Sequence, residues 1–278
     1  QSPHLLDKFQ DVTISVPKTL VISTEGFDSF ISENNLEEVT TGDFSDEKII
    51  RLFTSARLPE WLGRNLEMYL SHARYPLAIR SSSLLEDAQF QPFAGIYKTY
   101  MIPNNHSDLT VRYRQLLLAI KLVYASTYCE SARAYIKSTF HRTEDEKMAV
   151  VIQQLTGENY GQYFYPAISG VAQSYNYYPI AHMKPEDGLA HIALGLGKIV
   201  VEGGAAMRFS PKYPQLLPQF STVDDILENA QRFFYALKLD NFPDDLAGNE
   251  DATLEKLDIY ATMHAARVRH LCSTYSAQ

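Results

Sequence analysis

Cysteine is scarce in this sequence: Cys129 and Cys272 are the only two in 278 residues, and neither has a metal-ligand neighbour. Two cysteines so far apart provide no disulfide framework and no zinc-ligand spacing, so we expect a reducing, cytoplasmic location. The eight histidines show neither metal-site spacing nor a neighbouring Ser-Asp arrangement. These absences argue against a zinc site and against Ser-His-Asp chemistry.

Positive charge is also limited, because 25 Lys and Arg stand against 33 Asp and Glu, a formal net charge of −8. Nucleic-acid binding needs a basic face, so we expect no such partner. A small anionic ligand needs only one arginine and a few backbone N–H groups. No apolar run approaches the ~20 residues that span a bilayer, and no signal-peptide pattern opens the chain, so we expect no membrane partner.

The sequence does contain enough apolar material for a sizeable core, with 45% hydrophobic and 21% charged residues. Extended patterns cover residues 12–24, 76–80, 148–154, 168–176 and 188–204, with an aromatic hairpin turn around 158–165. Helical spacing covers residues 25–34, 45–56, 58–70, 107–140, 221–239 and 252–273. This mixed order predicts an α+β fold. The first residue is Gln1 rather than Met, which predicts a piece of a longer protein.

One stretch, IRSSSLLEDAQFQPFAG (79–95), changes abruptly from apolar to polar at Arg80. A guanidinium group matches phosphate oxygens well, and the hydroxyls of Ser81, Ser82 and Ser83 could add donors. Serines also begin turns and cap helices, so a strand-end arginine followed by a capped turn explains the same residues. The stretch by itself leaves both interpretations open.

Six collinear segments, this stretch among them, resemble the N-terminal nucleotide-binding module of the phosphoenolpyruvate synthase and pyruvate phosphate dikinase family. The segments are VPKTLVISTEGFDSFI (16–31), IRSSSLLEDAQFQPFAG (79–95), VYASTYCESARAYIK (123–137), MAVVIQQL (148–155), SGVAQSYNYYP (169–179) and GLGKIVVEGG (195–204). The resemblance implies an ATP-grasp fold, with two lobes around a nucleotide cleft. We expect one truncated module over residues 1–278, with lobes near 1–140 and 141–220 and a helical extension over 221–278.

The resemblance also implies a function. Modules of this family use ATP to phosphorylate a mobile histidine on a separate domain, which passes the phosphoryl group to pyruvate. We therefore expect ATP and magnesium as cofactors, other domains of the same protein as partners, and an ATP-dependent phosphotransferase as the parent activity. The residues 1–278 alone are expected to be inactive, and their oligomeric state is not predicted.

Several residues match functional positions of the family. The expected ATP-binding residues are Arg80, Ser81, Gly95, Gln153 and Gly197, and the expected supporting residues are Glu86 and Asp87. In the family the arginine contacts the ATP phosphates, and the first glycine belongs to a loop that covers them. We expect the acidic pair to orient Arg80, because a bare carboxylate repels a triphosphate.

The sequence also departs from the family pattern. IYKT (96–99) stands where the family has Gln-Gln-Glu-Thr, so Ile96 and Tyr97 replace polar residues. The family's Gly-Gly-Lys-Gly segment has no match, and the acidic metal ligands of its late strand have none in NEDATLEKLDIYATMHAARVRH (249–270), which reads as helical. We expect the magnesium ligands to lie outside this sequence. A non-catalytic nucleotide sensor and a protein-interaction module with the same fold remain alternative hypotheses.

The glycines of GLGKIVVEGG superficially suggest a dinucleotide-binding turn. We reject that interpretation because the β-branched KIVV (198–201) predicts a strand where such a motif starts a helix.

Overall fold

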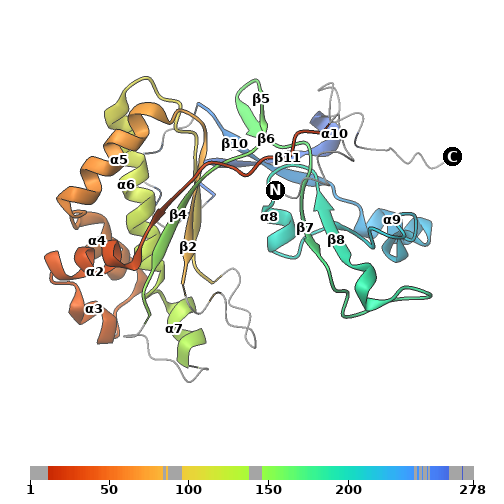
Figure 1. The fold of residues 1–278 in the computed structure, drawn as a ribbon, viewed down its shortest axis with the longest axis horizontal. Helices are drawn as coiled ribbons and strands as arrows, with labels where there is room; N and C mark the ends of the chain where they lie inside the picture. Colours follow the sequence, from red (N-terminus) through yellow and green to blue (C-terminus); the bar gives the residue numbers. More distant parts are fainter. Residues whose placement is uncertain are drawn as a thin grey trace.

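The computed structural model describes residues 12–83, 86, 96–137, 146–240, 243, 246, 249, 251–262 and 271 (Figure 1). The α-helices are α2 (Thr24–Glu33), α3 (Glu37–Thr41), α4 (Asp46–Ser55), α5 (Glu60–His72), α6 (Leu109–Ser126), α7 (Glu130–Lys137), α8 (Lys198–Val201), α9 (Val223–Asn229) and α10 (Ile259–Thr262). The strands are β1 (Thr19–Ile22), β2 (Leu77–Ser82), β3 (Thr99–Ile102), β4 (Ala149–Gln154), β5 (Glu158–Tyr160), β6 (Tyr163–Tyr165), β7 (Ser169–Gln173), β8 (Leu189–Ala193), β9 (Met207–Phe209), β10 (Phe233–Lys238) and β11 (Leu254–Asp258). The mixture confirms the predicted α+β class.

The first sheet has the strand order β1-β4-β2-β3, and every neighbouring pair is antiparallel. Successive strand residues point to opposite faces, so Leu77 and Ile79 of β2 enter the core while Arg80 is exposed. Helices α2 to α6 cover the core face, and the other face turns toward β7 and β8 (Figure 1). Among the described residues no helix packs on this second face, which we call the helix-free face of the first sheet.

The helices beside this sheet bury one stripe each, as their sequence period requires. Ser45 caps the start of α4, because its side chain accepts a hydrogen bond from Lys48 N at 3.4 Å. Phe30 and Phe53 meet at a ring-centroid distance of 5.6 Å, and Tyr124 of α6 packs on Phe30 at 5.3 Å. Aromatic packing therefore joins α2, α4 and α6 over the first sheet.

The second sheet, β11-β10-β6-β5, contains the predicted aromatic hairpin. Tyr160 and Tyr165 stack at 4.2 Å across β5 and β6, and Gly161 turns the chain with a φ of 63°. This sheet adjoins the first one at Met101, whose carbonyl accepts from Thr253 Oγ1 at 2.5 Å. The tyrosines of β5 and β6 are packing residues of a hairpin.

The third sheet, β7-β8-β9, is antiparallel throughout. Residues 198–201 next to it form helix α8, so the predicted strand at KIVV is wrong. Gly197 precedes the helix, and the single turn of α8 tolerates the β-branched residues that favour strands over longer runs. The dinucleotide-binding interpretation is still excluded, because that motif requires parallel strands joined by a crossover helix.

The C-terminal part differs from the sequence prediction. The helix predicted over 221–239 ends at Asn229, and Phe233–Lys238 continues as strand β10. Phe234, Ala236 and Leu237 are all fully buried, so an unbroken apolar run here reflects burial on both faces of a sheet rather than a helical stripe. A helix is also predicted over 252–273, but residues 254–258 of that segment form strand β11.

The first sheet draws strands from both halves of the chain. Strand β4 lies in the segment 141–220, which the sequence assigned to a second lobe, yet it pairs with β1 and β2. The strands predicted at 76–80, 148–154 and 168–176 are confirmed as β2, β4 and β7. No helix among the described residues combines the length and apolar character needed to cross a membrane.

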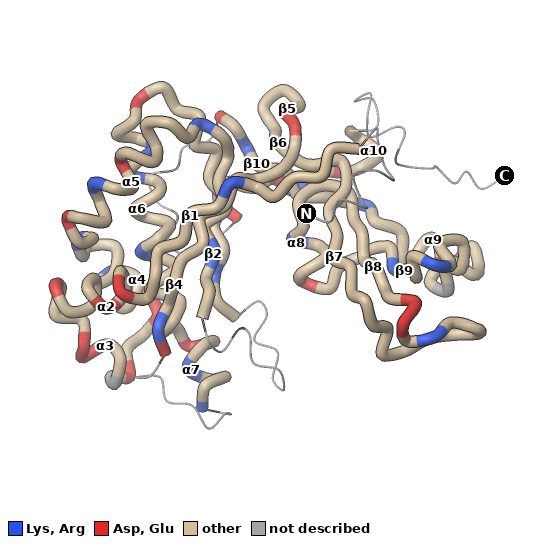
Figure 2. Tube along the Cα trace, viewed as in Figure 1, with Lys and Arg blue, Asp and Glu red and all other residues tan. Residues whose placement is uncertain are grey.

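Charge is unevenly distributed along the chain. Between Glu25 and Glu47 there are eight acidic residues and no Lys or Arg, and the acidic positions follow α2, α3 and the start of α4 (Figure 2). Two cations from later segments pair with this region. Lys147 Nζ lies 2.5 Å from Asp28 Oδ2, and Arg133 Nη1 lies 2.8 Å from Asp43 Oδ1.

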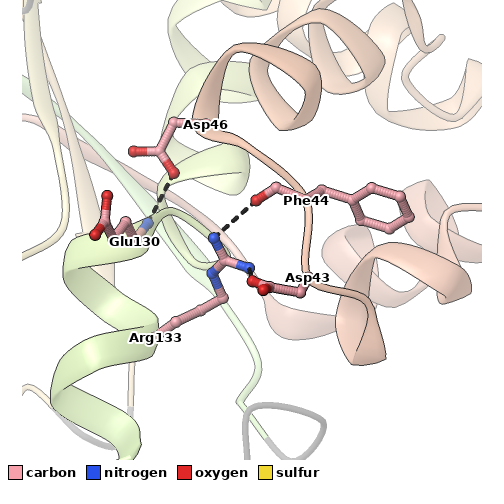
Figure 3. Close-up of polar contacts among 5 residues, drawn as sticks. All are labelled: Asp43, Phe44, Asp46, Glu130 and Arg133. Atoms are coloured by element: carbon pink, nitrogen blue, oxygen red, sulfur yellow. Dashed lines mark hydrogen bonds and ion pairs between the residues drawn. The ribbon is translucent and has the colours of Figure 1, made fainter.

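Figure 3 shows how the second of these cations attaches α7 to the loop before α4. The Arg133 guanidinium donates to Asp43 Oδ1 and to the Phe44 carbonyl, each at 2.8 Å, while Glu130 N donates to Asp46 Oδ1 at 2.8 Å. The carboxylate at the first turn of α7 complements the unpaired N–H groups there. This cluster is a structural contact between two helical segments.

Candidate functional site

The helix-free face of the first sheet brings two expected site residues together. Arg80 on β2 lies between Thr99 of β3 and Val151 of β4, and Gln153 of β4 faces Ala78 of β2. Directly opposed residues of an antiparallel pair share a face, so Arg80 and Gln153 lie on the same side of the sheet. Gln153 Nε2 also donates to Thr19 Oγ1 at 3.2 Å.

The turn after β2 is organised by Glu86. Its Oε1 accepts from Ser81 Oγ at 2.8 Å, and its Oε2 accepts from Ser83 N at 3.0 Å. Glu86 was expected to orient Arg80, but its described hydrogen bonds go to the turn that follows the arginine. They also engage the hydroxyl proton of Ser81, which was expected to bind phosphate.

Tyr97 and Lys98, which directly precede β3, lie at the same end of the sheet. Tyr97 OH donates to Glu146 Oε1 at 3.0 Å, and Lys98 N donates to Ser126 Oγ at 3.4 Å. Burial raises the pKa of the Tyr97 phenol, and the Glu146 carboxylate raises it further. Tyr97 therefore stays protonated as a donor, and the departure IYKT places this residue in the core rather than on a ligand.

Asp87 and Gly95 lie outside the described residues. Their expected roles stay predictions.

The two glycines of the Gly-Leu-Gly turn differ in what they require. Gly195 has a φ of 82°, and a Cβ there would meet Phe234 Cδ2 at 2.6 Å. A Cβ at Gly197 would meet Ser169 Cβ at an ordinary 3.7 Å. Gly195 is thus needed for the turn to pack on β10, whereas the fold does not demand glycine at 197.

The residue after this turn is a buried cation. Lys198 Nζ lies 2.7 Å from Glu202 Oε1 and 2.8 Å from Asp251 Oδ1, and its side chain is 12% exposed. Burial alone would lower its pKa, but the hydrogen bonds to Asp251 and Glu202 outweigh that effect and raise it. The Lys198–Asp251 ion pair therefore ties α8 to the segment before β11, and Glu202 pairs with the same lysine at the end of α8.

The late strands do not fit a magnesium site. The described residues contain no group of three or more His, Cys, Asp or Glu side chains able to hold a metal. Strand β10, FFYALK, has no acid; on β11, Glu255 pairs with Lys238 at 3.6 Å and Asp258 Oδ1 accepts from Ala261 N at 2.9 Å. Both acids of β11 therefore already have structural partners.

Cys129, beside the Arg133 cluster, is a partly buried thiol. Burial raises its pKa from 9.0 to about 12, with a further increase from the Asp46 carboxylate. At pH 8 we expect its alkylation to be about a thousandfold slower than that of a free thiol, because only the thiolate reacts. Timed iodoacetamide labelling of a Cys272→Ser variant, native and in urea, measures this. Rapid labelling of the native protein would contradict the burial.

Comparison with known proteins identifies the family of this chain. The family model described as "Pyruvate phosphate dikinase, AMP/ATP-binding domain" matches residues 4–262. The chain therefore belongs to the pyruvate phosphate dikinase AMP/ATP-binding domain family, and it is a nucleotide-binding module of the α+β class.

A curated relative shows the same kinship. The chain is 29% identical over 198 residues to the "Uncharacterized phosphotransferase YvkC" of Bacillus subtilis (strain 168), an alignment that covers 68% of this chain. It spans only 20% of that relative's length.

Glu146 and Tyr97 are the two residues of this region that the sequence did not mark as candidates. Glu146 stands in a charged run, TEDEK (143–147), where nothing distinguishes it from its neighbours. The sequence marks Tyr97 only as a departure from the family pattern. Tyr97 precedes β3 by two residues and belongs to the same buried hydrophobic cluster as Tyr100.

Proposed function

We propose that this chain is the ATP-binding module of a phosphoenolpyruvate-synthase-like phosphotransferase. ATP lies between the helix-free face of the first sheet and the region of β7, β8 and α8, in an ATP-grasp arrangement of two lobes. Its phosphates face Arg80 and Gln153, with Gly197 and the backbone of Ser81 nearby, because the Ser81 side chain lies on the opposite face of β2 and donates to Glu86. A phosphoryl group of ATP is transferred to a histidine on a separate domain. This histidine then passes the group to pyruvate or a related acceptor.

The observation that carries this proposal is the placement of Arg80. It is an exposed arginine in the middle strand pair of a sheet whose other side is fully covered, and it shares its face with Gln153. A planar guanidinium forms charge-assisted, often bidentate hydrogen bonds with phosphate oxygens. Positioning and positive charge are what phosphoryl transfer requires most from a protein.

A non-catalytic nucleotide sensor, or a module that binds another protein, is the second candidate. Two observations favour it. Tyr97 is buried at a position where the family has a polar residue, and the acids of β11 are engaged in structural contacts. A sensor needs nucleotide affinity but no arrangement for phosphoryl transfer.

Phosphoryl transfer in the native full-length protein separates the two candidates. With ATP radiolabelled in its terminal phosphates, we expect an acid-labile, base-stable label on the protein, since phosphohistidine has these properties. Adding pyruvate should discharge it. Binding of ATP without any protein label would favour the sensor, and an acid-stable label would point to a hydroxyl acceptor and contradict the histidine route.

A further inference from the structure

One hydrogen bond at the end of the first sheet joins two residues that no family motif assigns. Tyr97 OH donates to Glu146 Oε1 at 3.0 Å, and both residues are only 5% exposed. A carboxylate buried to this extent is costly unless it is hydrogen-bonded. The pair is therefore a specific contact rather than a surface coincidence.

The strand order of the first sheet shows which strands this contact connects. Tyr97 lies two residues before β3 begins, and Glu146 lies three residues before β4 begins. In the order β1-β4-β2-β3, these two strands flank β2, the strand of Arg80. The Tyr97–Glu146 hydrogen bond thus spans the end of β2 and joins its two neighbours.

The end of β2 itself is held at the same place. Ser83 is 6% exposed, and its backbone N–H donates to Glu86 Oε2 at 3.0 Å. Ser83 and Glu86 both lie close enough to Tyr97 to influence the pKa of its phenol. The residues that follow β2 therefore lie beside the Tyr97–Glu146 hydrogen bond, which joins the starts of β3 and β4.

We infer that Glu146 and Tyr97 form a clamp that positions Arg80 for the phosphates of the nucleotide. The inference rests on the proposed function, because it concerns the same site. Arg80 faces Thr99, the first residue of β3, and Val151, the third residue of β4, so its partners lie close to the strand starts that the clamp joins. Glu146 and Tyr97 are positioning residues: they hold the strands on both sides of Arg80 and do not touch the ligand.

Affinities for ATP and for adenosine, measured by calorimetry, test this clamp. Adenosine lacks phosphates, so it does not report on the placement of Arg80. For Tyr97→Phe, which removes the donor, we expect ATP binding to weaken about tenfold while adenosine binding changes less than about twofold. Glu146→Gln keeps an acceptor oxygen and should retain ATP affinity within about threefold of wild type, whereas Glu146→Met should lose it as Tyr97→Phe does.

A matched control removes a tyrosine hydroxyl elsewhere. Tyr69 OH lies 3.4 Å from Tyr75 OH, in a half-buried pair between the C-terminal end of α5 and the start of β2, and Tyr69→Phe should leave both affinities unchanged. Equal weakening of ATP and adenosine by Tyr97→Phe would make the contact merely structural, and unchanged ATP affinity would also overturn the clamp. If Tyr97→Phe does not fold, the difference between Glu146→Gln and Glu146→Met decides. A wild type that binds neither ligand refutes the proposed function itself, and the clamp with it.

Discussion

Replacing Arg80 with alanine should weaken ATP binding by about ten- to a hundredfold without changing the fold. A charge-assisted contact with phosphate contributes roughly 1.5–3 kcal/mol, which corresponds to one to two decades in affinity. The side chain is exposed on the helix-free face and contributes nothing to the core, so its loss should leave the melting temperature close to that of wild type. Isothermal titration calorimetry with ATP measures the affinity, and thermal unfolding followed by circular dichroism checks the fold.

Two further variants separate the position of Arg80 from its charge. Arg80→Lys keeps the charge but loses the planar fork, so we expect an intermediate affinity. Arg64→Ala removes an arginine whose side chain is 72% exposed and lies 3.7 Å from Glu60, on the helical side of the sheet, and it should bind ATP as wild type does. Equal ATP affinity in wild type and Arg80→Ala would reduce Arg80 to a strand-end arginine.

The second large effect is expected at Gly195. Alanine there must adopt a φ of 82°, and its Cβ would approach Phe234 Cδ2 to 2.6 Å and the Tyr235 carbonyl oxygen to 2.9 Å. Left-handed backbone costs an ordinary residue roughly 1–2 kcal/mol, and overpacking adds roughly 1–3 kcal/mol. We therefore expect Gly195→Ala to lower the free energy of unfolding by about 2–5 kcal/mol, as measured by urea denaturation.

Gly197 provides the matched control for this effect. Its Cβ would meet only Ser169, at 3.7 Å, so Gly197→Ala should leave the free energy of unfolding within about 0.5 kcal/mol of wild type. The same variant tests the expected role of Gly197 at the nucleotide. A drop in ATP affinity without a drop in stability would support close approach of the ligand, and a stability loss equal to that of Gly195→Ala would show that the packing of this turn is misjudged.

The first half of the fold could be predicted from local patterns. In β2 the alternation of Leu77, Ile79 and Arg80 separates core from surface, and Ser45 marks the start of α4 as a side-chain cap. The predictions failed where tertiary burial overrides periodicity. In Phe233–Lys238, Phe234 and Ala236 are buried on one face of the sheet and Leu237 on the other, so this apolar run fits a helix as well as a strand.

The candidate site was predictable where family motifs coincide with chemistry, as at Arg80 and Gln153, which the sheet register brings to one face. Contacts between segments that lie far apart in the sequence were not predictable. Glu86 binds the turn after β2, and Glu146 meets Tyr97 across 49 residues of sequence, because strand order rather than sequence spacing brings them together. A single sequence contains no signal for such pairing, since any acid in the run 143–147 could have been the partner.

The most direct test of the central claim is a crystal structure of the protein with a non-hydrolysable ATP analogue. The triphosphate should lie on the helix-free face of the first sheet, with a phosphate oxygen within about 3.2 Å of the Arg80 guanidinium and with Gln153 on the same side of the ligand. A nucleotide bound elsewhere, or one whose phosphates leave Arg80 facing solvent, would contradict the account.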